Sequence, residues 1–135
     1  MDPLLIEKMQ QLQIKKLLET TYREISSIQL IVLASVDGFN LATSGSKAQD
    51  FNLPEKFAAM ASSMAALSQA AGKELDANHQ SVTILDFKGL QIVLRIVKTS
   101  TNTFILAIAE SKEIILGNLL VKARDCAQNI KEALQ

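Results

Sequence analysis

Residues 30–44 read Leu-Ile-Val-Leu-Ala-Ser-Val-Asp-Gly-Phe-Asn-Leu-Ala-Thr-Ser, which is an apolar run, an Asp-Gly pair and a second short run. This pattern predicts a β-hairpin with strands at 28–36 and 39–43 and a two-residue turn at Asp37-Gly38. Asp-Gly suits a type I′ turn, because that turn needs a positive φ at both central residues. The hairpin indicates that an antiparallel sheet forms part of the fold.

A long helix is predicted after the hairpin, from residue 55 to about residue 76, with Pro54 in its first turn. The segment 55–76 has no β-branched residue and consists mainly of good helix formers. Spacings of three and four define one apolar face, which we expect to lie on the sheet: Phe57, Met60, Met64, Leu67, Ala71 and Leu75. A neighbouring face carries small or neutral side chains: Ala58, Ala59, Ser62, Ala65, Ala66 and Gln69. Such a face would let a partner helix approach closely.

The remaining segments complete the order α-β-β-α-β-β-β-α. A first helix is expected at 3–26, with Asp2 as its N-cap and Pro3 at its first position. Three strands are expected at 81–87, 90–98 and 103–109, followed by a last helix capped by Ser111. The sequence therefore predicts a single α/β (α+β) domain over residues 1–135, a five-stranded antiparallel sheet with helices on both sides.

Composition argues against several classes of function. Lys and Arg number 14 and balance 14 Asp and Glu, so net charge does not favour nucleic acid as a partner. The apolar runs are shorter than the roughly 18 to 20 residues that cross a bilayer. The single cysteine, Cys126, cannot form an internal disulfide, and no leader-like segment opens the chain. We therefore expect a cytoplasmic protein that neither binds nucleic acid nor inserts into a membrane.

The sequence contains no recognisable catalytic apparatus. Every Ser-His-Asp or Cys-His scheme would need His79, the only histidine, which we expect in an exposed polar turn. Cys126 is expected to be a small core residue rather than an activated thiolate. One His and one Cys cannot supply a zinc site, and neither common glycine-rich phosphate-binding pattern occurs. We therefore predict a non-enzyme with no catalytic residue, metal or cofactor.

Four short motifs carry a resemblance to a known family. They are Ser-Val-Asp-Gly-Phe-Asn-Leu-Ala at 35–42, the Ala-rich helix at 56–67, Phe-Lys-Gly-Leu-Gln-Ile-Val-Leu at 87–94 and Ile-Leu-Gly-Asn-Leu-Leu at 115–120. Together with the order of elements, they resemble the Roadblock family of dynein light chains over nearly the whole chain. The resemblance implies a profilin-like Roadblock fold and a homodimer that pairs through the central helix and the third strand. The contact residues that it implies are Ala59, Ser62, Ser63, Ala66, Gln69, Ala70, Ser81, Thr83 and Leu85.

The resemblance also implies a function, because prokaryotic relatives often act beside Ras-like small GTPases as activators or platforms. It implies a non-catalytic homodimeric scaffold that binds such a GTPase and can modulate its GTP hydrolysis. The sequence offers no obvious arginine finger, because a role as a salt-bridged surface residue explains each arginine at least as well: Arg23, Arg95 and Arg124. Faster GTP hydrolysis is therefore expected to come from positioning of the GTPase's own residues. The alternatives are a small-molecule sensor, which strands rich in Val, Ile and Leu disfavour, and an interaction adaptor without a GTPase partner.

Overall fold

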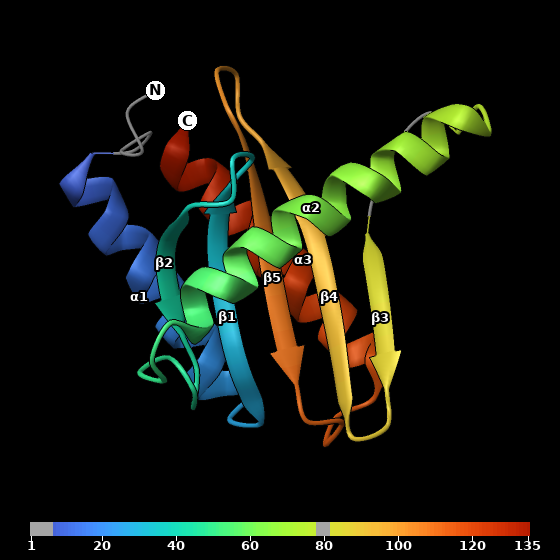
Figure 1. Ribbon diagram of the computed structural model, residues 1–135. Helices are drawn as coiled ribbons and strands as arrows, with labels where there is room; N and C mark the ends of the chain where they lie inside the picture. The colour runs from blue at the N-terminus through green and yellow to red at the C-terminus, as the bar shows by residue number, and fades with distance from the viewer. Residues whose placement is uncertain (1–6, 78–81) are drawn as a thin grey trace.

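The computed structural model describes residues 7–77 and 82–135 (Figure 1). Its elements follow the predicted order: α1 (Lys8–Glu24), β1 (Ile28–Ser35), β2 (Asn40–Ser44), α2 (Leu53–Glu74), β3 (Thr83–Phe87), β4 (Leu90–Lys98), β5 (Thr103–Glu110) and α3 (Leu116–Leu134). The predicted start of the first helix, at Asp2 and Pro3, lies outside the described residues. Pro54 lies in the first turn of α2, as predicted.

The five strands form one sheet in the order β2-β1-β5-β4-β3, and every neighbouring pair is antiparallel. The central strands β1 and β5 pair from Ile28 opposite Glu110 to Ser35 opposite Phe104. Strands β2 and β3 are the two edges. The predicted five-stranded antiparallel sheet is confirmed.

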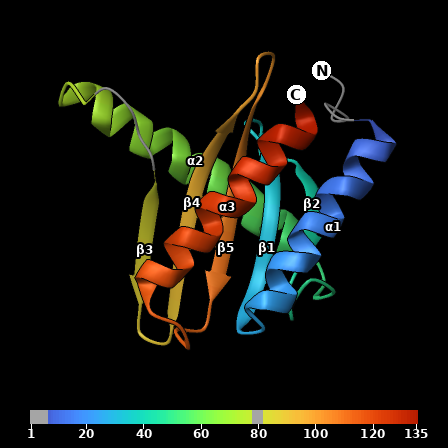
Figure 2. The ribbon, with the colours of Figure 1, turned by 180° about the vertical axis from the view of Figure 1, so that it is seen from behind.

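Helices cover both faces of the sheet, as predicted. Helix α2 crosses one face, and α1 and α3 lie side by side on the other (Figures 1 and 2). Because side chains alternate between the two faces of a strand, β1 sends Ile31 and Leu33 toward α1 and α3, and Leu30 and Val32 toward α2. The result is a three-layer structure with a separate apolar core on each side of the sheet.

Ser35 and Phe39 close the hairpin between β1 and β2 and leave a three-residue loop at 36–38. The prediction of a two-residue type I′ turn is therefore wrong. The N–H of Gly38 donates to the carbonyl of Ser35 at 3.0 Å, and the N–H of Ser35 donates to the carbonyl of Phe39 at 3.0 Å. Gly38 has a φ of +90°, whereas Asp37 does not have a positive φ. This pattern matches a three-residue hairpin in which glycine takes the left-handed position.

Helix α2 explains why the longer loop forms. The hydroxyl of Ser62 donates to the carbonyl of Val36 at 2.9 Å, which ties the loop to the helix. A Cβ on Gly38 would lie 3.3 Å from the Cα of Ala59, so the loop also packs closely on the helix backbone. A contact across the fold therefore selects a turn that the local Asp-Gly signal does not.

Helix α2 is rotated relative to the sequence prediction. The small side chains of Ala58, Ala61, Ser62 and Ala65 are buried beside Phe57, as is Pro54. Met60, Leu67 and Leu75, which were predicted to face the core, are exposed. The large side chains that project from the strands beneath fill the space between sheet and helix, so alanine and serine pack there better than leucine or methionine.

Helix α3 begins later than predicted. Its N-cap is Ile115, and Ser111 does not cap it; the Ser111 hydroxyl instead accepts a hydrogen bond from the Gln29 side chain at 2.9 Å. The N–H groups of Lys112 and Glu113 donate to the Glu110 carboxylate. These bonds hold the residues after β5 as a loop and delay the first helical turn.

We expect Gly45→Ala to lower the free energy of unfolding by about 3 kcal/mol. Gly45 has a φ of +117°, and a Cβ there would lie 2.6 Å from the carbonyl oxygen of Gln29. Gly89→Ala is the matched control, because Gly89 also has a positive φ but nothing lies within 4 Å of its added Cβ. The control should lose only about 1 kcal/mol in urea denaturation, and equal losses would contradict the steric explanation.

Candidate dimer interface

Strand β3 leaves one edge of the sheet uncovered. It pairs with β4 from Thr83 opposite Leu94 to Phe87 opposite Leu90, and no described strand lies on its other side. An edge strand presents backbone groups that a further strand can pair. The Phe87 side chain is 50% exposed and Ile84 is also exposed, so apolar surface accompanies this edge.

The C-terminal half of α2 projects beyond this edge. The helix crosses the sheet obliquely and continues past β3, with no strand beneath its last turns (Figure 1). Leu67 and Leu75, at and just after this part of the helix, are 71% and 82% exposed. Large exposed apolar side chains next to an open sheet edge are typical of a surface that another protein covers.

The predicted interface residues divide into three groups. Those on the outer flank of α2 are exposed: Ala59, Ser63, Ala66, Gln69 and Ala70. Ser62 is buried and uses its hydroxyl within its own chain, as described above. Thr83 and Leu85 lie half-buried on β3, and Ser81 lies outside the described residues.

Sequence reasoning missed the exposed apolar side chains of this region. Leu67 and Leu75 were assigned to the core face of the helix, and Ile84 and Phe87 were treated only as strand residues. A helical spacing identifies an apolar stripe but does not tell whether that stripe meets the chain's own sheet or a second molecule.

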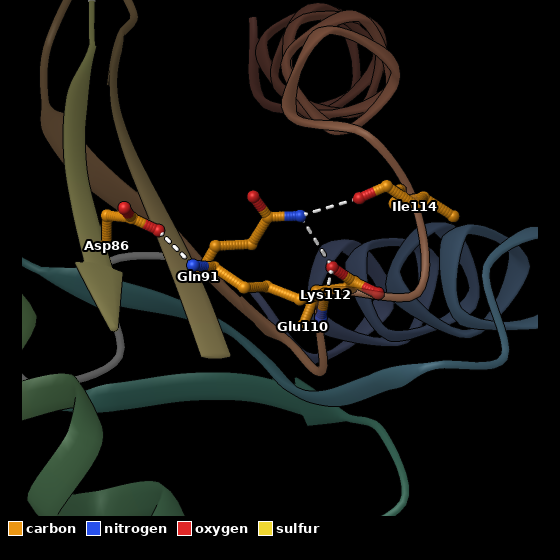
Figure 3. Close-up of polar contacts among 5 residues, drawn as sticks. All are labelled: Asp86, Gln91, Glu110, Lys112 and Ile114. Carbon is orange, nitrogen blue, oxygen red and sulfur yellow. Dashed lines mark hydrogen bonds and ion pairs between the residues drawn. The ribbon is translucent and has the colours of Figure 1, made fainter. Parts of the chain in front are cut away.

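A buried carboxylate organises the end of the sheet next to this edge (Figure 3). Glu110 is fully buried, and its Oε1 accepts hydrogen bonds from Gln91 Nε2 at 2.7 Å and from the Lys112 N–H at 2.9 Å. Its Oε2 accepts from the Ser27 hydroxyl at 2.7 Å and from the Glu113 N–H at 2.8 Å. Burial alone would raise the pKa of Glu110, but these four bonds outweigh it and hold the pKa below its usual value.

This network connects the loop after β5 to β4 and β3. The Gln91 amide, from β4, also donates to the carbonyl of Ile114 at 3.0 Å. The ammonium group of Lys112 forms an ion pair with Asp86 on β3 (Figure 3). This ion pair lies at the surface, where such pairs contribute little energy.

The described residues offer no arrangement for metal or thiolate chemistry. They contain no group of three or more His, Cys, Asp or Glu side chains that could hold a metal ion. Burial raises the pKa of the Cys126 thiol to about 11, and the nearby charge of Glu24 also raises it, so the thiol is neutral at pH 7. Cys126 is a core residue, as predicted, and His79 lies outside the described residues.

No helix in the described part of the chain combines the length and the apolar character that a membrane-spanning helix needs.

Comparisons with known proteins agree on the fold. The Roadblock/LC7 domain model matches residues 14–110. No curated protein gives a significant match to the chain. Among solved structures, a Roadblock/LC7 domain from Streptomyces avermitilis is 17% identical with a TM-score of 0.78, covering 89% of this chain and 96% of that one.

Two of the solved structures that bear the name MglB are similar as well. The gliding protein MglB from Thermus thermophilus is 16% identical with a TM-score of 0.81, covering 95% of this chain and 93% of that one. A structure described as MglB with a tetrameric arrangement is 19% identical with a TM-score of 0.80, covering 96% of both chains. At these identities the likeness shows the fold.

Proposed function

The chain belongs to the Roadblock/LC7 family, and from that premise we propose that it is a non-catalytic homodimeric scaffold that binds a Ras-like small GTPase and modulates its GTP hydrolysis. The GTPase partner follows from the family resemblance. The homodimer is supported by features of the chain itself.

The uncovered β3 edge beside the projecting half of α2 is the observation that carries this proposal. Pairing of β3 with β3 of a second copy would satisfy both open edges and join two sheets into one. The projecting turns of each α2 would then have a second molecule to pack against. A relative whose structure is described as a tetrameric arrangement is consistent with self-association in this fold.

The proposed effect on GTP hydrolysis works by positioning. Arg23 donates a hydrogen bond to Thr20 within α1, so it is not held ready as an arginine finger. A rigid two-copy surface can instead order the GTPase's own catalytic loops. We also propose a cytoplasmic location, which the single unpaired cysteine supports.

We expect the chain to raise the GTP turnover of a Ras-like small GTPase by about 100-fold if loop positioning is the mechanism. Single-turnover GTP hydrolysis with and without the chain measures the effect, and co-elution on a sizing column measures binding. A dimer-disrupting variant is the control, because it should lose the acceleration while remaining folded. The absence of both binding and rate change would exclude a GTPase role.

A further inference from the structure

A second surface feature, which adjoins the β3 edge, is a strongly basic groove of about 1030 Å³. It lies between the C-terminal part of α2, the start of β3, the end of β4 and α3. Its cationic lining residues are Lys73, Arg95, Lys98, Arg124 and Lys131. None of the described lining residues is acidic or aromatic, although the chain as a whole carries equal numbers of acidic and basic residues.

Arg95 is the most unusual member of this lining. It lies inside β4 on the side that faces α3, since its neighbours Val93 and Val97 belong to the core cluster on that side. Its Nε is buried and has no hydrogen-bond partner. A buried donor without an acceptor costs free energy, so this atom requires an explanation.

The charge around Arg95 is also uncompensated. Burial lowers the pKa of the Arg95 guanidinium, and the positive charge of Arg124 lowers it further. Arg124 pairs with Asp125 only at the surface, where both side chains are largely exposed. In the described part of the chain, Arg95 forms no ion pair, and neither do Lys73, Lys98 and Lys131.

We propose that this groove binds a phosphate-rich anion, with Arg95 and Arg124 as its principal contacts. Arginine forks bind phosphate oxygens in pairs, and the three lysines add the positive charge that a multiply charged ligand needs. The groove is about as large as the upper range of small-molecule sites, roughly 1,000 Å³. Without an aromatic side chain to stack on a base or ring, the phosphate groups themselves are what the groove recognises.

The groove adjoins the proposed dimer interface, because Gln69 and Thr83 belong to its lining as well. The cationic residues all come from one chain and none belongs to the predicted interface. A chain that fails to dimerise or to bind a GTPase can still bind the anion, and the reverse also holds.

The test uses the full chain and inorganic tripolyphosphate in isothermal titration calorimetry at constant ionic strength. We expect saturable binding that Arg95→Met and Arg124→Met each weaken about tenfold or more, the equivalent of about 1.4 kcal/mol. Arg23→Met is the charge-matched control, because Arg23 lies on α1 outside the groove, and it should bind normally. Without anion, Arg95→Met should unfold at the same or a higher temperature, since it removes an unpaired charge.

A parallel experiment distinguishes the source of the phosphate. Co-sedimentation is measured with phosphatidylcholine vesicles that contain or lack phosphatidylinositol bisphosphate. Binding to tripolyphosphate alone indicates a free ligand, and binding to both probes indicates a lipid headgroup; each supports the proposal. It is overturned by a lack of saturable binding to either probe, by equal binding of Arg95→Met, or by binding only to a polyglutamate peptide, which would indicate a protein partner.

Discussion

Replacement of Leu67 by glutamate is expected to convert the proposed dimer into monomers, with an increase in the dimer Kd of about 100-fold or more. Leu67 is 71% exposed on the projecting half of α2, beside the β3 edge. In the proposed dimer, the variant would lose the burial of a leucine, about 2 kcal/mol, and would bury a carboxylate at the cost of its hydration. Sedimentation equilibrium over a range of protein concentrations measures the change.

Leu12→Glu is the matched control for this experiment. Leu12 is 61% exposed on α1, which lies on the opposite face of the sheet from α2 (Figure 2). This variant should dimerise normally, and both variants should show the circular dichroism of the unmodified chain. A dimer that persists in Leu67→Glu, or dissociation in both variants, would contradict the assigned interface.

Replacement of Glu110 by alanine is expected to lower the free energy of unfolding by about 3 to 5 kcal/mol. The substitution removes a carboxylate that accepts four hydrogen bonds. The Gln91 amide and the N–H groups of Lys112 and Glu113 would then lack this acceptor. The loop before α3 would lose the contacts that hold it to β4. Urea denaturation followed by circular dichroism measures the loss.

Two further variants identify the cause of that loss. Glu113→Ala keeps the backbone N–H that bonds to Glu110 and should change stability little, because the Glu113 side chain is exposed. The stability of Glu110→Gln should lie between those of the alanine variant and the unmodified chain. Its amide oxygen can still accept hydrogen bonds, but its NH₂ group is a donor and would face donors. Equal stability of the alanine variant and the unmodified chain would show that the network is not a stabilising one.

The pH dependence of stability follows from the same carboxylate. Its pKa is lowered in the folded chain, so its charged form stabilises the fold fully above the unfolded-state pKa, near about 4.3. This contribution is lost as the pH falls through the lower folded-state pKa. The unmodified chain should therefore lose more stability than Glu110→Gln across that acidic range.

Local signals in the sequence were sufficient for much of the fold. Strand β4 was predicted with its observed bounds, because turn residues at 88–89 and 99–102 enclose an apolar run. The existence of α2 was predicted from helix propensity, but its rotation was not. Alanine lies on several sides of this helix, so the face toward the sheet depends on the space that the strands leave.

Long-range contacts account for what was missed. Ser27 and Glu110 are 83 residues apart in sequence, and no spacing rule links them. The sequence does not distinguish Arg95 from a surface arginine, because the partial burial of its side chain depends on how α3 packs over β4. The flank of α2 was identified as a candidate interface, but its exposed leucines became visible only once the helix was oriented.

The projecting end of α2 has a thermodynamic consequence. None of its residues after Ala65 is buried, so nine residues of helix, 66–74, extend beyond the support of their own sheet. A segment this short is marginal as an isolated helix in water, so these last turns depend on the buried turns that precede them in the same helix. In the proposed dimer they would gain a second contact, and their protection from hydrogen exchange would then rise with protein concentration.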